Sequence, residues 1–145
     1  MRPALIAFIA LGAAACATGP AEAPSGGASA WIDGVKFTSM GQGTGAFSAT
    51  IDGSTNAAAP YTIRVHITKG GRIAPHTHPD TRLITVVDGE LCYGFGETFD
   101  ENGCKVYPEG STFVVPGGKP HFGFGKSDAI YQESGVGPSA FVPVR

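Results

Sequence analysis

The stretch of sequence that decides the fold runs from residue 70 to residue 89 and reads GGRIAPHTHPDTRLITVVDG. At its centre, His76 and His78 are separated by one residue. Side chains two positions apart on a β-strand point to the same face, so both imidazoles can reach one metal ion. Two histidines on a wet strand face produce the same pattern, so the pair by itself leaves both interpretations open.

The flanking sequence is typical of short β-strands joined by tight turns. Residues 61–68 alternate strictly between an apolar and a polar face. Five further segments have strand-like composition: 83–87, 91–95, 112–115, 129–132 and 141–144. Asp88-Gly89 predicts a two-residue hairpin turn, and Asn102-Gly103 marks another turn. No segment after residue 30 shows a helical period, so we predict an all-β antiparallel sandwich or barrel.

Two spaced motifs occur in order along the chain. The first has Gly70, five residues, His76-Thr77-His78 and then Gly89, and the second has Gly110, Pro116, Gly118 and His121. Together they resemble the two motifs of the cupin superfamily and cover roughly residues 70–125. The resemblance implies a double-stranded β-helix, which is a jelly-roll-like barrel. It also implies that His76, His78 and His121 bind one divalent metal ion, for which Fe, Zn, Mn and Ni are the candidates.

Arg82 stands where the family pattern has a glutamate ligand. Arginine stays protonated and cannot bind a metal. Its strand parity matches that of His78, so without a bulge after Pro79 it enters the barrel on the histidine side. A divalent ion plus Arg82 would then carry three positive charges, which are costly to bury without an anion. We therefore expect a small anionic ligand held by the metal and Arg82. The alternatives are a metal-free anion pocket, and an Arg82 that pairs with Asp80 at the rim.

Gln132 is the second residue expected to contact the ligand. It lies on the strand expected over residues 129–132 and could orient a ligand or a metal-bound water. The alternative is that its amide satisfies a buried backbone group.

Two classes of function fit these residues. One is a metal-dependent oxidoreductase of the dioxygenase type, and the other is a non-catalytic small-molecule-binding or sensing module. Cupins carry many reactions, so the fold does not choose between the two classes. Lys+Arg 10 against Asp+Glu 12 gives a net charge of -2 with no basic patch, so nucleic acid is not an expected partner. A homodimer is an expectation from the resemblance alone.

The first residues resemble an export signal. Arg2 precedes an apolar run over residues 4–15, which is too short to span a bilayer core of ~30 Å. Residues 13–16 resemble a lipobox ending at Cys16, and small residues at 15–17 and 21–23 resemble ordinary cleavage sites. We predict a signal peptide or lipoprotein signal over 1–23, a flexible tether over 17–29 and a cupin domain over 30–145.

The same features predict the location of the protein. The later sequence, with its Gly-Phe-Gly at 94–96 and Gly-Val-Gly-Pro at 135–138, is similar to small exported bacterial cupins. We therefore expect a periplasmic protein or outer-membrane lipoprotein of a Gram-negative bacterium. Its membrane attachment would come only through a lipid on Cys16.

The sequence leaves two alternatives for Cys92 and Cys104. They form a disulfide, or they remain two buried thiols. Direct opposition of the two cysteines would centre their hairpin at Thr98. A two-residue turn at Asn102-Gly103 would instead place Cys104 opposite Glu101. Only a longer loop over residues 99–103 permits the pairing.

Overall fold

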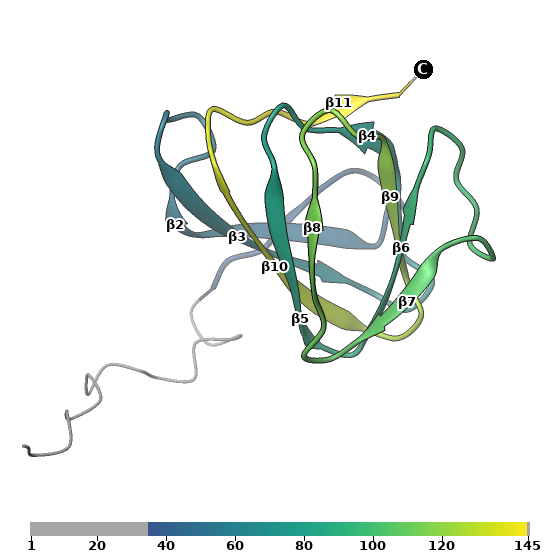
Figure 1. Ribbon diagram of the computed structural model, residues 1–145. Helices are drawn as coiled ribbons and strands as arrows, with labels where there is room; N and C mark the ends of the chain where they lie inside the picture. Colours follow the sequence, from purple (N-terminus) through teal and green to yellow (C-terminus); the bar gives the residue numbers. More distant parts are fainter. Residues whose placement is uncertain (1–34, 145) are drawn as a thin grey trace, which may run out of the picture. The chain divides into compact units, whose positions relative to one another are not determined.

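The computed structural model describes residues 35–144 (Figure 1). The predicted signal over 1–23, the lipidation site at Cys16 and the tether over 17–29 lie outside the described residues, as does the start of the predicted cupin domain. Over residues 35–144 the chain forms eleven β-strands and no helix. This part of the chain therefore has no helix long and apolar enough to cross a membrane.

The strands form two antiparallel sheets. The six-stranded sheet runs in the order β1 (Thr38–Ser39), β2 (Ala46–Gly53), β3 (Pro60–Ile67), β10 (Ala129–Val136), β5 (Arg82–Asp88) and β8 (Thr112–Val115). The five-stranded sheet runs in the order β11 (Val142–Pro143), β4 (Arg72–Thr77), β9 (His121–Gly125), β6 (Glu90–Phe95) and β7 (Lys105–Pro108). This arrangement of two antiparallel sheets confirms the predicted all-β fold.

From β3 to β11 the chain changes sheet at each connection except the β6–β7 hairpin. Asp88-Gly89 was predicted to close a hairpin, and this prediction is wrong, because β5 and β6 belong to different sheets. Gly89 does have the left-handed backbone that the motif favours, with φ of 74°. A Cβ at this position would also collide with the backbone of Asp128 and Ala129. Gly89 therefore turns the chain at a corner where a neighbouring segment packs tightly against it.

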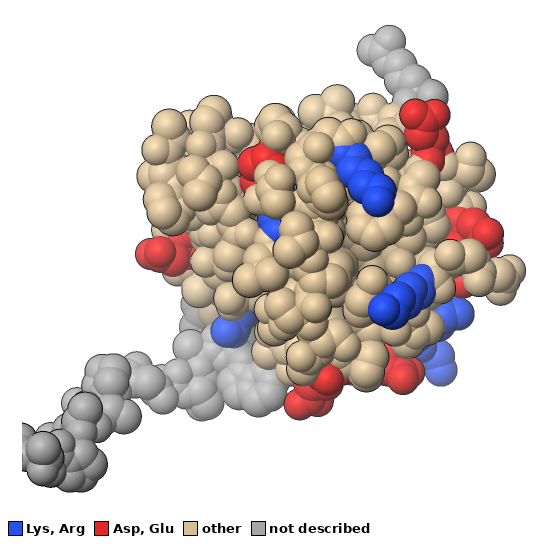
Figure 2. All heavy atoms as spheres, in the orientation of Figure 1, with Lys and Arg blue, Asp and Glu red and all other residues tan. Residues whose placement is uncertain are grey.

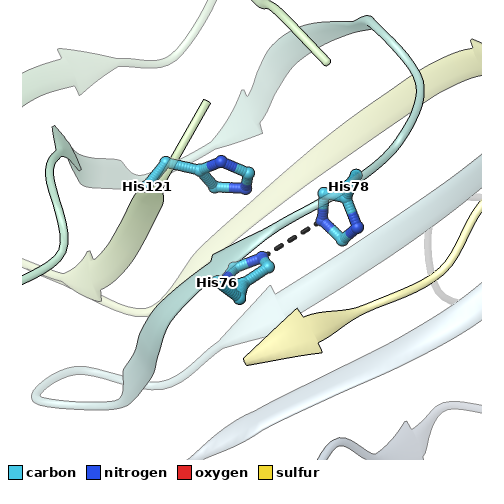
Figure 3. Close-up of side chains that lie close together, drawn as sticks. All are labelled: His76, His78 and His121. Carbon is cyan, nitrogen blue, oxygen red and sulfur yellow. Dashed lines mark hydrogen bonds between the residues drawn. The ribbon is translucent and has the colours of Figure 1, made fainter. Parts of the chain in front are cut away.

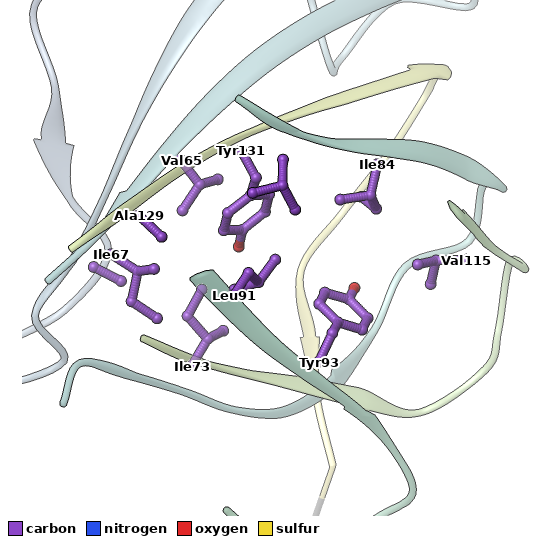
Figure 4. Packing of buried hydrophobic residues seen from close by; sticks show 11 residues of the cluster. Val65, Ile67, Ile73, Ile84, Leu91, Tyr93, Val115, Ala129 and Tyr131 are labelled. Atoms are coloured by element: carbon purple, nitrogen blue, oxygen red, sulfur yellow. The ribbon is translucent and has the colours of Figure 1, made fainter. Parts of the chain in front are cut away.

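The space between the sheets is filled by apolar side chains (Figure 4). The alternation predicted for residues 61–68 is confirmed, because Tyr61, Val65 and Ile67 are almost completely buried. The facing sheet contributes Leu91 and Tyr93 from β6. Because successive side chains of a strand alternate, each strand covers this core with one face and presents the other outward.

Cys92 and Cys104 are joined by a disulfide, with Cα atoms 5.5 Å apart. In the β6–β7 hairpin, Cys92 lies opposite Val106 and Tyr93 lies opposite Lys105. The two cysteines therefore lie diagonally across the hairpin, and the connecting loop is long. Asn102-Gly103 lies in a turn inside this loop, so the longer loop over residues 99–103 is the alternative that the structure contains.

The face of the domain shown in Figure 2 is mostly uncharged, and its basic and acidic side chains lie scattered over it. This face has no extended patch of one charge sign.

Candidate metal centre

The three histidines of the two motifs come together inside the barrel (Figure 3). His76 lies on β4 and His121 begins the neighbouring strand β9, where the two residues are register partners. His78 follows the end of β4. All three are buried, with exposed fractions of 5%, 6% and 1% for His76, His78 and His121.

Backbone carbonyl groups fix the tautomer of all three rings. Nδ1 of His76 lies 2.8 Å from the Ala74 oxygen, and Nδ1 of His78 lies 2.7 Å from the Ala140 oxygen. Nδ1 of His121 lies 2.8 Å from the oxygen of Lys119. A carbonyl oxygen only accepts, so each Nδ1 carries the hydrogen and each Nε2 of a neutral ring presents a lone pair. This is the arrangement that metal-binding histidines use.

Two of these lone pairs face each other directly. Nε2 of His76 lies 3.1 Å from Nε2 of His78, along the dashed line of Figure 3. A hydrogen bond here would require one ring to carry a second proton. Burial is the main cause that lowers the pKa of His76 to about 3 and that of His78 to about 4. At neutral pH the rings are therefore uncharged, and a cation between them would remove the repulsion between the lone pairs.

The geometry fits one metal ion. Candidate ligand nitrogens from His76, His78 and His121 all lie within 4.8 Å of one another. Metal–nitrogen bonds of about 2.1 Å place the ligands of one ion roughly 3 to 4 Å apart, so small ring movements would complete the site. Burial also lowers the pKa of His121, which keeps the third ligand neutral.

The segment before β11 holds part of this site. The Ala140 oxygen accepts the hydrogen bond from His78, and the Phe141 ring stacks on His76 with centroids 4.0 Å apart. On the other side, the Tyr93 ring stacks on His121 with centroids 5.4 Å apart. None of these supporting contacts was predicted from the sequence, because Ala140 acts through its backbone and no local pattern marks Phe141 and Tyr93 as neighbours of the histidines.

Arg82 enters the barrel on the histidine side, as its strand parity predicted, but its charge is already paired. Its Nη1 donates to Glu133 Oε2, its Nη2 donates to Ser139 Oγ at 2.6 Å, and its Nε lies 3.5 Å from Asp80 Oδ2. Burial lowers the pKa of Arg82, but the adjacent carboxylates overcome this effect and raise it above its ordinary value.

The two carboxylates correct the expected charge of the site. Burial raises the pKa of Glu133 above its ordinary value, and the contact with Arg82 opposes that rise without cancelling it. Hydrogen bonds from Ser139 and Tyr61 outweigh the burial of Asp80 and lower its pKa. With both groups ionised, a divalent ion and Arg82 would leave one net positive charge rather than the three expected.

Glu133 is the main charged residue of the site whose inward position was not predicted from the sequence. It lies on β10, two positions beyond the buried Tyr131, and so it shares the inward face. Extending the predicted strand from 129–132 to 129–136 would have shown this parity. The structure places Gln132 on the other face of β10, opposite Arg64 and Thr85. The structure therefore does not bring Gln132 together with the histidines.

His76 and His78 line a pocket of about 420 Å³, which we call the polar pocket. Its polar wall contains His76, His78, Arg82, Glu133 and Ser139. The rest of its lining is largely apolar and includes Met40, Ile63, Val65, Ile73 and Phe141. A buried metal-sized site thus adjoins a ligand-sized space whose lining combines charged and polar side chains with an apolar wall.

Comparison with known proteins identifies the family. A family model described as Cupin matches residues 40–131. The chain belongs to the cupin family. The prediction made from the two histidine motifs is therefore confirmed.

The curated relatives match a part of this cupin domain. Germin-like protein 3-8 of Oryza sativa subsp. japonica is 48% identical over 60 residues, which cover 41% of this chain and 27% of that protein. The rhicadhesin receptor of Pisum sativum is 40% identical over 60 residues, covering 41% of this chain and 28% of that protein. The matches thus span less than a third of the length of either relative.

Solved structures extend the match over most of the domain. A structure of oxalate oxidase is 30% identical, has a TM-score of 0.60 and covers 75% of this chain and 60% of that chain. An RmlC-like cupin from Shewanella frigidimarina has a TM-score of 0.56 at 19% identity, covering 77% and 86%, and it shows the fold alone.

These relatives correct the predicted location. The germin-like proteins and the rhicadhesin receptor come from Oryza sativa, Pisum sativum and Arabidopsis thaliana. They point to a plant protein, so the prediction of a Gram-negative periplasmic protein or outer-membrane lipoprotein is wrong.

Proposed function

We propose that this cupin domain binds one divalent metal ion through His76, His78 and His121 and uses it to bind and oxidise a small carboxylic acid. The observation that carries the proposal is the fixed tautomer of the three rings. Each Nδ1 donates to a backbone carbonyl, so three Nε2 lone pairs converge in a buried site. Fe, Zn, Mn and Ni are the candidate ions, since all accept imidazole ligands.

The charges around the site favour a carboxylate ligand. A divalent ion, Arg82, Asp80 and Glu133 together leave one positive charge, which a singly charged acid would neutralise. Three histidine ligands leave coordination positions on the ion open for oxygen atoms. When bound, the ion would polarise the acid and, if it is redox-active, accept or pass on electrons.

The protein residues have defined tasks in this proposal. Ala74, Lys119 and Ala140 hold the rings through their carbonyls, while Phe141 and Tyr93 cover the outer faces of His76 and His121. Arg82 contributes charge to the pocket wall. The sequence suggested that the guanidinium of Arg82 would be free to hold the ligand together with the metal. In the structure, Nη1 and Nη2 of Arg82 already donate to Glu133 and Ser139.

The oxalate oxidase structures support oxidation as the reaction. They are 30% identical to this chain, and one of them is described as a complex with glycolate. A second candidate is binding without turnover, which is favoured by the match to a protein named as a receptor.

Metal titration tests the binding part of the proposal. Metal-free protein is expected to bind one Mn²⁺, Fe²⁺, Ni²⁺ or Zn²⁺ per chain, measured by calorimetry and elemental analysis. His76→Ala, His78→Ala and His121→Ala should each weaken binding by at least about tenfold. His66→Ala is the matched control, because His66 contacts Phe37 and Phe47 away from the cluster. Equal binding by all four variants would contradict the proposal.

Oxygen consumption separates the two candidate functions. Protein loaded with Mn²⁺ or Fe²⁺ and supplied with glycolate or oxalate should consume oxygen, and the His76→Ala variant should not. Saturable binding of the acids without oxygen consumption would favour the binding module.

A further inference from the structure

The polar pocket adjoins a second, mostly apolar pocket of about 560 Å³. We call this the apolar pocket, and its lining is Met40, Thr44, Ile73, Ala74, Pro75, Glu97, Phe141, Pro143 and Val144. Glu97 is the single charged residue in this lining. Met40, Ile73 and Phe141 line both pockets, so the two spaces share a wall.

The shared wall presents apolar surface to solvent beside a buried polar site. Phe141 is 47% exposed and Met40 is 36% exposed, although both are large apolar side chains. Phe141 places one ring face against His76, so the apolar surface begins directly at a proposed metal ligand. Exposed apolar surface next to convergent polar groups is typical of a site whose ligand carries an apolar part.

The polar pocket alone, at about 420 Å³, is larger than a two-carbon acid can fill. Such an acid would lie beside the polar residues His76, His78 and Arg82. The apolar side chains of Met40, Ile73 and Phe141 would then remain in contact with water. We infer that the ligand is a singly charged carboxylic acid with an apolar substituent, whose head binds at the histidines and whose substituent lies against Met40 and Phe141 and extends into the apolar pocket. This inference rests on the carboxylate site proposed above.

A homologous series of 2-hydroxy acids tests the inference. Glycolate, 2-hydroxybutanoate and 2-hydroxyhexanoate share one head group and differ in chain length. Zinc-loaded protein allows binding to be measured by calorimetry without turnover, because Zn²⁺ is redox-inert. Affinity is expected to rise roughly three- to fourfold per methylene that is buried.

One variant locates the substituent. Val144→Glu places a charge in the apolar pocket, and Val144 does not line the polar pocket where the head group binds. This variant should remove most of the increase in affinity with chain length while leaving glycolate affinity within about twofold. Val114→Glu is the matched control, because Val114 lies on β8 and is 55% exposed. This variant should retain the full increase in affinity with chain length.

The outcomes separate this inference from the proposed function. If glycolate binds and longer acids bind no better, the inference is overturned while the carboxylate site stands. If Val144→Glu keeps the increase in affinity with chain length, or if Val114→Glu removes it as strongly, the substituent does not lie in the apolar pocket and the inference also falls. If no acid binds the zinc-loaded protein, the proposed function itself fails.

Discussion

At the scale of single residues, the same contacts that aim the histidines also keep them neutral. The Nδ1 atom of each histidine donates a hydrogen bond to a backbone carbonyl oxygen, and burial disfavours a second proton on the ring. Beside them, Arg82 is surrounded by Glu133, Asp80 and Ser139. The site therefore combines neutral candidate metal ligands with a cation whose charge is compensated inside the protein.

The neutral histidines predict how stability depends on pH in the metal-free protein. The pKa values of His76 and His78 are about 3 and 4 in the folded state, against an ordinary value of 6.5. Below about pH 6.5 the unfolded chain binds protons that the folded chain does not, so stability falls as the pH drops toward 4. Each ring contributes at most about 1.4 kcal/mol per pH unit.

Urea unfolding of chelator-treated protein between pH 7 and pH 4 measures this dependence. The double variant His76→Asn/His78→Asn should show a shallower loss of stability, and His66→Asn should match the wild type. If the free energy of unfolding of the double variant depends on pH as steeply as that of the wild type, these two rings do not govern stability in acid.

The buried charge pair predicts a non-additive effect on stability. Arg82→Met leaves Glu133 buried without its partner, which should cost roughly 3 to 5 kcal/mol. Adding Glu133→Met to that variant should recover a large part of the loss, because no unpaired charge then remains at that position. Chemical denaturation of both variants provides the test, and a double variant as unstable as Arg82→Met would contradict the account.

At the scale of elements, the barrel depends on connections that carry the chain from one sheet to the other. Gly70 and Gly89 both have positive φ, at 78° and 74°, and both follow strands of the larger sheet. Their surroundings differ, because a Cβ on Gly70 meets nothing within 4 Å, whereas a Cβ on Gly89 meets the backbone of Asp128 and Ala129.

This difference predicts unequal costs for the same substitution. Gly70→Ala should cost about 1 to 2 kcal/mol through backbone strain alone. Gly89→Ala should cost more, since the added methyl group also displaces the backbone at Asp128. Thermal unfolding of the two variants compares them directly, and equal midpoints would mean that the corner at Gly89 is not tightly packed.

The sequence predicted the strands that are marked by a pattern within their own residues. Alternation at residues 61–67 and the apolar run at 83–87 identified β3 and β5, and the histidine spacing identified the family. Asp88-Gly89 predicted a left-handed turn correctly but placed β5 and β6 side by side, because a turn signal does not say which strand becomes the neighbour. Asp80 was one of the partners considered for Arg82, but the ion pair with Glu133 was missed because Glu133 is 51 residues away along the chain.

At the scale of the whole domain, the site is assembled from both sheets. The smaller sheet provides His76 and His121 on β4 and β9, and the larger sheet provides Arg82 and Glu133 on β5 and β10. Residues 139–141, between β10 and β11, contact His76, His78 and Arg82 and so join the two groups. Residues distant in the sequence thus converge on one pocket, as the alternation of the chain between the sheets permits.

The central claim is that three Nε2 atoms bind one metal ion. Anomalous diffraction from crystals of the metal-loaded full-length protein tests this claim most directly. The account predicts one peak bonded to Nε2 of His76, His78 and His121 at about 2.1 Å, with oxygen ligands in the remaining positions. A peak elsewhere, bonding through Nδ1, or no peak at full metal loading of folded protein would contradict it.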